Sequence, residues 1–168
     1  PIKHIYHLRV TRHGKMIVLD VRATAFLHHM VRNIMGCLLE IGQGLYEVDH
    51  IDEIFEGRKK AVEAYDNFLD FSKIQKLKIR ENTRWNYHYY PVIFDSEETL
   101  LKVKDALNKE NIFPRRYFYP SLNTVKYLNG EKMPISESVS KRIICLPLYA
   151  ELQPEMAEKI SKIINKTL

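Results

Sequence analysis

The first stretch that could do chemistry covers residues 26–36, where two histidines and an arginine stand among large hydrophobic side chains. His28 and Arg32 are four residues apart, so in a helix both side chains would emerge on one face. A purely structural helix would more often carry glutamate or lysine there. Arginine suits a site that holds a carboxylate, because its planar guanidinium pairs with both oxygens and keeps its proton. His28 and His29 are more often packed or hydrogen-bonded in such a place than catalytic.

Together with residues 18–25, this stretch resembles the C-terminal signature of the bacterial tRNA pseudouridine synthase A family, over residues 4–57 or so. The resemblance implies isomerisation of uridine in tRNA without cofactor or metal. A buried aspartate does the covalent chemistry in that family, a basic neighbour holds it ionised, and a positive cleft receives the flipped nucleotide. Arg32 corresponds to the basic neighbour, and Leu27 and Met30 would form walls of the base pocket.

The family's aspartate lies in an N-terminal half that these 168 residues do not include. Asp20 is present, but the resemblance puts it on a returning strand rather than in the catalytic loop. Without that aspartate, Arg32 is an arginine on a helix, paired with another carboxylate or with solvent. We therefore expect no uridine isomerisation from this stretch alone.

A second resemblance is carried by three motifs in order, at residues 85–94, 115–123 and 145–149. They resemble the C-terminal domain of the pyridoxal-phosphate-dependent nucleotide-sugar aminotransferases, the DegT/DnrJ/EryC1/StrS group, from about residue 58 to the end. The aromatic motif at residues 117–123 is similar to that of members acting on keto sugars linked to thymidine diphosphate.

This resemblance implies that a lysine forms the Schiff base with pyridoxal phosphate and an aspartate pairs with its pyridine nitrogen, both in a large domain that is not matched here. The remaining part would shape the sugar-nucleotide pocket, with Arg115 and Arg116 on phosphates and Tyr117 and Tyr119 on the sugar. Many relatives carry histidine where Asn123 stands, so the resemblance does not decide whether Asn123 handles a proton. The alternative is that the aromatic alternation only buries one face of a strand.

Net charge, cysteine content and the length of the apolar runs limit which classes of protein this can be. A net charge of +5 permits an acidic partner such as nucleic acid or a nucleotide, although lysine-rich helix faces produce the same sum. Cys37 and Cys145 lie in apolar runs and are expected to be buried, reduced thiols. No cysteine–histidine spacing suits zinc, no apolar run could cross a membrane, and the first residues lack a signal peptide's apolar core. We expect a cytoplasmic protein.

The elements that must position these residues follow from periodicity. Residues 4–11 and 16–23 alternate as the two strands of a hairpin, and residues 25–41 have a helical period, with Thr24 as the expected N-cap. A short amphipathic helix follows at residues 48–55. Residues 58–71 continue the helical spacing, so Gly57 either breaks the helix or lies within one long helix.

Further along, residues 72–84 are expected to form a loop with one short strand, and residues 85–94 a strand. Ser96 should cap a helix. Residues 115–120 are a strand or extended loop, residues 129–130 a turn, residues 136–142 a helix and residues 143–146 a buried strand. Pro154 fits the first turn of a last helix.

We therefore expect an α+β fold in two small domains: residues 1–57, a hairpin with helices, and residues 58–168, a small sheet covered by helices. Six of the seven histidines precede residue 51 and six of the seven prolines follow residue 90, as at a domain junction. The function expected is a composite of two enzyme fragments without independent catalysis and without cofactor bound by this chain alone. One alternative is an active enzyme that is completed by a partner chain or by a second copy in a homo-oligomer. The other is a module that binds tRNA weakly. A nucleotide-diphospho sugar is the other expected ligand.

Overall fold

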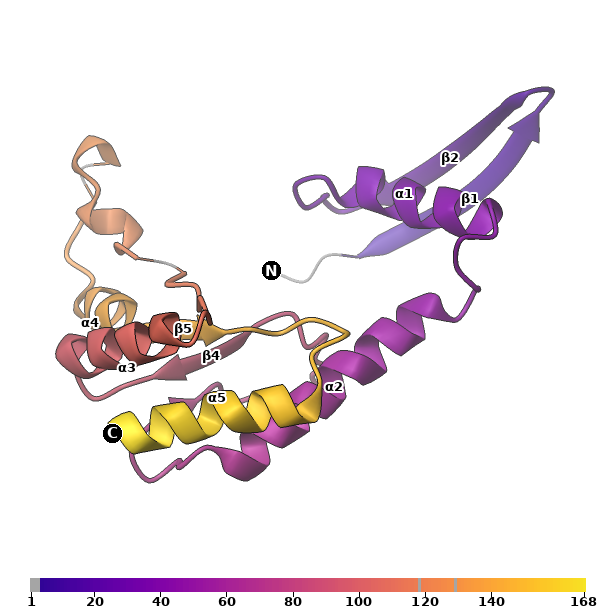
Figure 1. The fold of residues 1–168 in the computed structure, drawn as a ribbon. Helices are drawn as coiled ribbons and strands as arrows, with labels where there is room; N and C mark the ends of the chain where they lie inside the picture. Colours follow the sequence, from indigo (N-terminus) through magenta and orange to yellow (C-terminus); the bar gives the residue numbers. More distant parts are fainter. Residues whose placement is uncertain (1–3, 118, 129) are drawn as a thin grey trace. The chain divides into compact units, whose positions relative to one another are not determined.

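The computed structural model describes residues 4–117, 119–128 and 130–168, which fall into two compact units, Pro1–His50 and Ile51–Leu168 (Figure 1). The α+β class predicted from the sequence is confirmed. The turn predicted at residues 129–130 lies partly outside the described residues. The boundary predicted after residue 57 separates the two family resemblances rather than two compact units, and it remains a prediction.

The first unit is a β-hairpin followed by a helix: β1 (Ile5–His13), β2 (Met16–Ala23) and α1 (Met30–Gly42). The predicted hairpin is confirmed, with Gly14 at a φ of 60° in its two-residue turn, a conformation that costs glycine little. The antiparallel register pairs Leu8 with Val21 and Val10 with Leu19. Since side chains alternate along a strand, these four apolar residues share one face, while His7, Arg9, Asp20 and Arg22 lie on the other.

The helix starts later than the sequence predicted, at Met30 rather than residue 25. Thr24 is not its cap. The Thr24 hydroxyl accepts a hydrogen bond from the His4 amide (2.9 Å), and the Thr24 amide donates to the His4 carbonyl, closing the open end of the hairpin. His29, with a φ of 59°, precedes the helix, so the four-residue spacing of His28 and Arg32 does not place them on one helical face.

No described residue of the first unit has a buried side chain. Large apolar residues such as Leu8, Val10 and Ile17 are between 45% and 55% exposed. A hairpin and one helix cannot enclose a core, because too little chain surrounds the apolar face. The stability of this unit on its own is therefore expected to be low.

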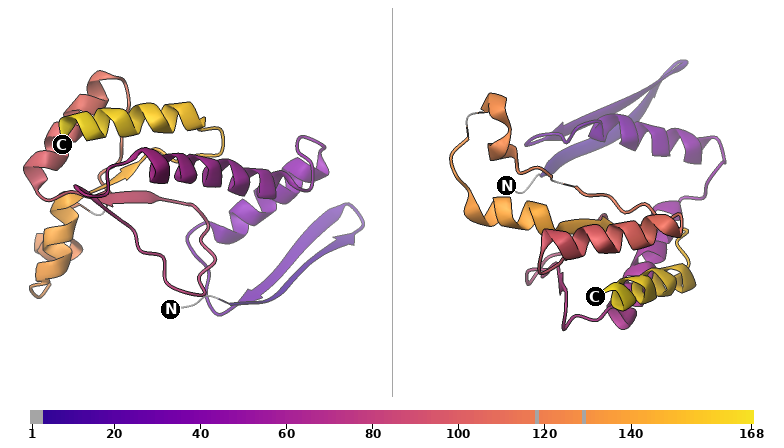
Figure 2. Two further views of the ribbon diagram at one scale, coloured as in Figure 1. Left: turned by 90° about the horizontal axis from the view of Figure 1, so that it is seen from below. Right: turned by 60° about the vertical axis from the view of Figure 1, so that its left-hand side comes forward.

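The second unit is a three-stranded antiparallel sheet in the order β3–β4–β5, with helices packed around it (Figures 1 and 2). Its strands are β3 (Gln75–Lys76), β4 (Tyr90–Ile93) and β5 (Ile143–Leu146). Its helices are α2 (His50–Phe68), α3 (Glu97–Lys109), α4 (Pro134–Arg142) and α5 (Pro154–Thr167), with 3-10 turns η1 (Leu122–Thr124) and η2 (Lys126–Leu128). The predictions of α3 with its Ser96 cap, of α4, of β5 and of α5 are confirmed.

The strand predicted over residues 85–94 is shorter than expected and begins only at Tyr90. Tyr87 has a φ of 49°, which an extended strand does not allow. The Asn86 side chain also accepts a hydrogen bond from the His88 amide at 3.2 Å, a local turn that competes with sheet pairing. The segment before β4 is thus a loop, which frees His88 and Tyr89 to line a cavity.

The core of the second unit is built from α2, α3, α5 and the strands β4 and β5. α5 lies beside α2, where the Asn165 side chain donates to the Phe68 carbonyl (2.7 Å) and accepts from the Asp70 amide (3.1 Å) (Figure 2). α2 is one continuous helix through Gly57, so the alternative of a break there is wrong. A Cβ atom at Gly57 would lie 2.2 Å from the Ala150 carbonyl oxygen, so only glycine permits this approach.

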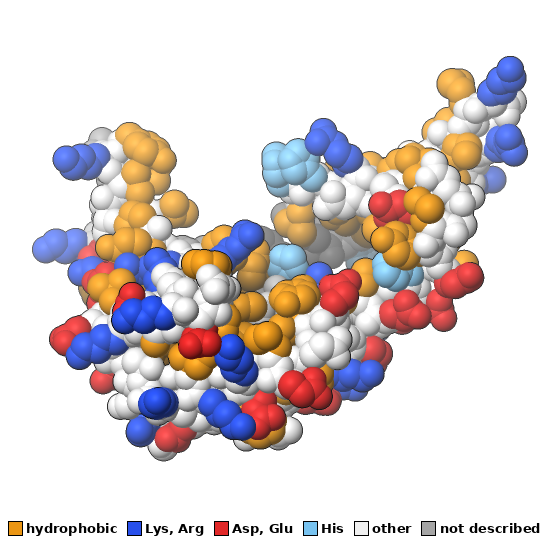
Figure 3. Space-filling model, in the orientation of Figure 1, with side chains coloured by type: hydrophobic (Ala, Val, Ile, Leu, Met, Phe, Trp, Pro, Cys, Tyr) orange, Lys and Arg blue, Asp and Glu red, His pale blue; other side chains and the backbone are white. Residues whose placement is uncertain are grey.

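Hydrophobic side chains also remain at the surface of the second unit (Figure 3). They gather over η1, η2 and the start of α4, where Leu122, Tyr127 and Ile135 are each more than 70% exposed. A cluster of this kind is more apolar than most of a monomer's surface.

Candidate ligand-binding site

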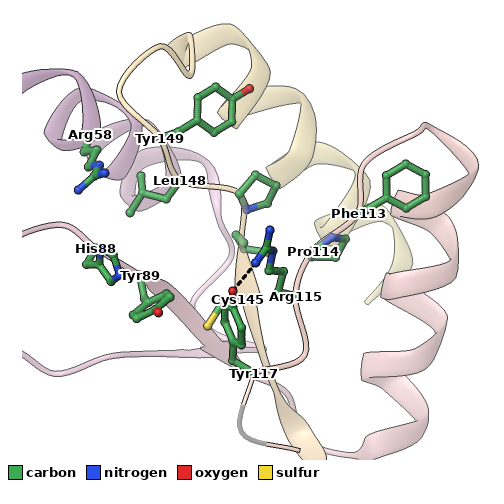
Figure 4. A pocket seen from close by; sticks show the side chains of 12 residues that line it. Arg58, His88, Tyr89, Phe113, Pro114, Arg115, Tyr117, Cys145, Leu148 and Tyr149 are labelled. Atoms are coloured by element: carbon green, nitrogen blue, oxygen red, sulfur yellow. Dashed lines mark hydrogen bonds between the residues drawn. The ribbon is translucent and has the colours of Figure 1, made fainter. Parts of the chain in front are cut away.

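The three motifs of the second resemblance meet at one cavity of about 420 Å³ in the second unit (Figure 4). Its lining comes from α2, the loop before β4, the segment after α3, and the end of β5 with the loop that follows. The residues are Arg58, His88, Tyr89, Phe113, Pro114, Arg115, Tyr117, Cys145, Leu146, Pro147, Leu148 and Tyr149. The volume lies within the range of small-molecule sites.

Arg115 is placed by a short backbone pairing with β5. Its amide donates to the Cys145 carbonyl at 3.1 Å, and its own carbonyl accepts from the Cys145 amide at 2.8 Å. Its guanidinium then donates to the Tyr117 hydroxyl at 2.5 Å (Figure 4). Arg115 and Tyr117, both predicted as ligand contacts, therefore line one cavity.

Arg58 and His88 were not predicted as site residues. Arg58 reaches from α2 toward His88 on the loop before β4 (Figure 4). The sequence carried a signal for Arg58: it lies three, four and seven residues before Ala61, Val62 and Tyr65, all buried. An arginine on the inward stripe of an amphipathic helix is unusual and points to a role inside the fold.

The cavity is cationic and carries no counter-charge from its lining. Arg58 and Arg115 line it, and no aspartate or glutamate is among its described lining residues. Burial raises the pKa of the Cys145 thiol to about 11, so this cysteine is a neutral part of the wall at physiological pH. The predicted burial of Cys145 is confirmed, whereas that of Cys37 is wrong, because Cys37 is exposed on α1.

Arg116 does not line this cavity. Its guanidinium forms an ion pair with Glu97 at the start of α3 and donates to the Lys141 carbonyl at 2.9 Å. It also stacks over the Tyr119 ring, 3.6 Å from the centroid. The structure thus ties Arg116 and Tyr119 to each other, and their predicted contacts with phosphate and sugar stay predictions.

Asn123 is likewise held by protein partners. Its amide donates to Glu137 at 2.6 Å and to the Glu131 carbonyl at 2.9 Å, and its oxygen accepts from the Ser121 hydroxyl. The Met133 amide and the Asn123 amide together lower the pKa of the Glu137 carboxyl. Asn123 organises the turn before α4, and the cavity's lining residues do not include it.

In the first unit, the residues predicted to form a base pocket lie at the start of α1, and none of them is buried. Leu27 is 63% exposed and Met30 half-buried. Arg32 is exposed and makes no hydrogen bond or ion pair within the described part of the chain. Asp20 lies on β2, as expected, and sits 3.2 Å from the His7 ring rather than near a helix arginine.

The described lining does not fit pyridoxal phosphate as a Schiff-base coenzyme, because it contains no lysine and no acid for a pyridine nitrogen. Outside the lining, Lys76 pairs with Asp66 at 2.9 Å and lies over the Phe71 ring. We therefore derive no chemistry through the coenzyme in this chain.

Comparison with family models gives two matches that overlap at residues 41–76. Residues 1–76 match the tRNA pseudouridine synthase model, and residues 41–165 match the DegT/DnrJ/EryC1/StrS aminotransferase family. Both resemblances read from the sequence are confirmed. Within the described residues, no helix has both the length and the apolar character needed to cross a membrane.

The curated relatives divide in the same way. The tRNA pseudouridine synthase A of Acinetobacter baumannii (strain AYE) is 64% identical over 63 residues, covering 36% of this chain and 24% of that protein. The dTDP-4-amino-4,6-dideoxy-D-glucose transaminase of Escherichia coli is 31% identical over 142 residues, covering 78% and 38%. The chain thus spans well under half the length of either relative.

Solved structures place the fold with the aminotransferases. TlmJ of Streptoalloteichus hindustanus superposes with a TM-score of 0.65 at 18% identity, covering 88% of this chain and 40% of that one. The putative sugar aminotransferase Spr1654 of Streptococcus pneumoniae, solved in its PLP form, has a TM-score of 0.60 at 25% identity, covering 74% and 35%. With three-quarters of its length in the matching model, the chain belongs to the DegT/DnrJ/EryC1/StrS aminotransferase family, and it carries a tRNA pseudouridine synthase-like segment at its start.

Proposed function

We propose that these 168 residues are a composite of two enzyme fragments without catalysis of their own. One observation supports this: in neither unit do the described residues place at the site the group that the parent chemistry requires. The cavity lining of the second unit has no lysine for a Schiff base, and Arg32 of the first unit has no carboxylate partner among the described residues. The parent activities are transamination of a nucleotide-linked keto sugar with pyridoxal phosphate, and conversion of uridine to pseudouridine in tRNA.

Two assays test the proposal directly. Purified protein is incubated with pyridoxal phosphate, glutamate and a dTDP-linked 4-keto sugar, and separately with unmodified tRNA. We expect no amino sugar and no pseudouridine above the background without protein. Turnover that is lost on substituting Arg32 or Arg115 would refute the proposal, and the same variants control for a contaminating enzyme.

Within this composite, we assign the contact with a nucleotide-diphospho sugar to the second unit. Arg115 and Tyr117 line the cavity, which supports this assignment, while Arg116, Tyr119 and Asn123 would need to leave their present partners to join it. Arg115→Gln should therefore weaken binding of a dTDP-sugar more than Arg116→Gln does. Equal loss in both variants would favour a site that spans both arginines.

A second candidate is an enzyme completed by another chain, or by a further copy of this one. The absence of any buried side chain in the described first unit favours it, because such a surface suits a larger fold. Co-expression with the remainder of a tRNA pseudouridine synthase A should then yield a stable complex that modifies tRNA. A complex that forms neither in cells nor on mixing would exclude this candidate.

A third candidate, weak binding of tRNA, is favoured by one face of the hairpin. The register pairs His7 with Arg22 and places Arg9 and His13 on that same face, with Asp20 as the acid among them. Phosphate contacts release counterions, so affinity for tRNA should fall steeply as salt rises. Affinity that is undetectable, or insensitive to salt, would remove this candidate.

A further inference from the structure

The cavity of the second unit collects three nitrogen-bearing side chains from three separate segments: Arg58 from α2, His88 from the loop before β4, and Arg115 from the segment after α3 (Figure 4). We propose that Arg58 and His88 complete, together with Arg115, a diphosphate-binding site within the second unit. Neither Arg58 nor His88 belongs to the residues expected to contact phosphate. This inference rests on the proposed function at one point, the assignment of Arg115 to the ligand.

The state of Arg58 is the main support. The Nε atom of Arg58 is buried and has no hydrogen-bond partner within the described part of the chain. A buried donor without an acceptor costs free energy, and the cost is larger for a charged group. Nε itself is covered, so a ligand oxygen in the cavity would accept from the outer nitrogens of this guanidinium, and these charge-assisted hydrogen bonds would offset part of the cost.

Charge balance points to an anion. Both guanidinium groups are cationic, and burial raises the pKa of the Cys145 thiol, which therefore adds no negative charge. Tyr117 already accepts from Arg115, which leaves that arginine's other donors for a ligand. Two guanidinium forks and an imidazole offer more donors than one carboxylate can accept, but they suit the oxygens of a diphosphate.

The rest of the lining suits the group attached to the diphosphate. Tyr149, Tyr89 and Phe113 give aromatic surface beside the cationic residues. A cavity of about 420 Å³ holds a diphosphate together with one ring of its substituent. Free pyrophosphate and a nucleoside diphosphate both carry the diphosphate group that this site would bind. The experiment below distinguishes these two ligands.

The test is calorimetric titration of the full chain with pyrophosphate, dTDP and thymidine. We expect saturable binding of pyrophosphate and dTDP with one site per chain, and none of thymidine. Arg58→Gln and Arg115→Gln should each weaken pyrophosphate binding at least about tenfold, the effect of losing a hydrogen bond to a charged group. Arg84→Gln, which removes the same charge from an exposed position outside the cavity, should change it less than about twofold.

His88→Ala supplies a third variant, on an exposed loop where folding is not at risk. Circular dichroism of each variant checks the fold, and Arg58→Lys keeps the charge if Arg58→Gln does not fold. Tighter binding of dTDP than of pyrophosphate identifies a nucleoside diphosphate as the ligand, and equal binding identifies the diphosphate alone. The proposal is overturned if pyrophosphate does not bind saturably, or if Arg84→Gln weakens binding as much as the cavity variants.

This result is independent of the activity assays. A chain that binds pyrophosphate through Arg58 and turns over no substrate supports both statements. A chain that is inactive and binds no pyrophosphate leaves the composite proposal standing and removes this one. Turnover in the transamination assay refutes the composite proposal. Pyrophosphate binding by the variants then still decides the present inference.

Discussion

Among single residues, neighbouring side chains of one motif have different roles. Arg115 lines the cavity, whereas Arg116, the next residue, forms an ion pair with Glu97 and stacks on Tyr119. Along an extended segment, successive side chains point to opposite sides, so a pair of arginines rarely serves one ligand. Arg58, 57 positions earlier in the chain, is the better companion for Arg115.

The two cysteines should differ sharply in reactivity. Cys145 is 5% exposed and burial raises its pKa to about 11, so at pH 8 only roughly one molecule in a thousand carries the reactive thiolate. Cys37 is exposed on α1. We expect a disulfide reagent at pH 8 to modify Cys37 rapidly and Cys145 slowly.

The Cys37→Ser variant checks this assignment. It should lose the fast phase and keep a slow one, which accelerates as the pH rises toward 11 because the thiolate fraction increases. Rapid modification of the Cys37→Ser variant at pH 8 would show that Cys145 is accessible. It would also remove the argument that this thiol is a neutral part of the cavity wall.

Among the helices and strands, α2 has a part in both the fold and the site. It carries Arg58 into the cavity, packs Ala61 and Tyr65 into the core, and passes Gly57 close to the Ala150 backbone. The Tyr65 hydroxyl donates to the Pro147 carbonyl at 2.9 Å, which joins the helix to the loop after β5. The position of Arg58 therefore depends on how closely α2 approaches residues 147–150.

Gly57→Ala should destabilise the second unit. The added Cβ would lie 2.2 Å from the Ala150 oxygen, and backbone cannot yield as a flexible side chain does. We expect a loss of about 1–3 kcal/mol in urea unfolding followed by circular dichroism, together with weaker pyrophosphate binding. Gly36→Ala in α1 is the matched control, since nothing described lies within 4 Å of its added Cβ and alanine favours helix by about 1 kcal/mol.

The cap of α3 is a second test at this level. The Ser96 hydroxyl accepts a hydrogen bond from the Thr99 amide at 3.0 Å. Ser96→Ala removes that acceptor and should cost about 1 kcal/mol of stability, while Ser96→Asp should retain most of it. An unchanged urea midpoint for Ser96→Ala would mean that Glu97 and Glu98 suffice to hold the first turn.

For the chain as a whole, the two units differ in how much surface they bury. The buried core residues all come from the second unit, starting at Ala61. Protection of amide hydrogens depends on the free energy of opening, which is low where few apolar contacts form. The two units should therefore exchange at very different rates.

Hydrogen exchange measured by mass spectrometry tests this difference. Peptides from β1, β2 and α1 should exchange within seconds to minutes, while those from β4, β5 and the inner face of α5 should remain protected much longer. Addition of a completing chain should slow exchange in the first unit alone. Equal protection of both units without a partner would show that the hairpin and α1 have a stable core.

Local features were predictable from the sequence because each depends on residues close together in the chain. The hairpin follows from alternation, α3 from Ser96 and its apolar period, and α5 from Pro154 and its apolar face. Three motifs in order indicated the aminotransferase family, and the single stretch of residues 18–36 indicated the pseudouridine synthase family. The start of α1 was missed because Thr24 bonds to His4, twenty residues away, instead of capping a helix.

The cavity could not be predicted in this way, because its walls come from four segments that only packing brings together. Arg58 and Cys145 are 87 positions apart, and the pairing of Arg115 with Cys145 depends on where β5 lies against β4. Alternation along the chain turns Arg116 away from Arg115, but its partners Glu97 and Lys141 are also brought to it only by packing. Residue types along the chain therefore indicated which chemistry is present, and long-range contacts determined which side chains share a site.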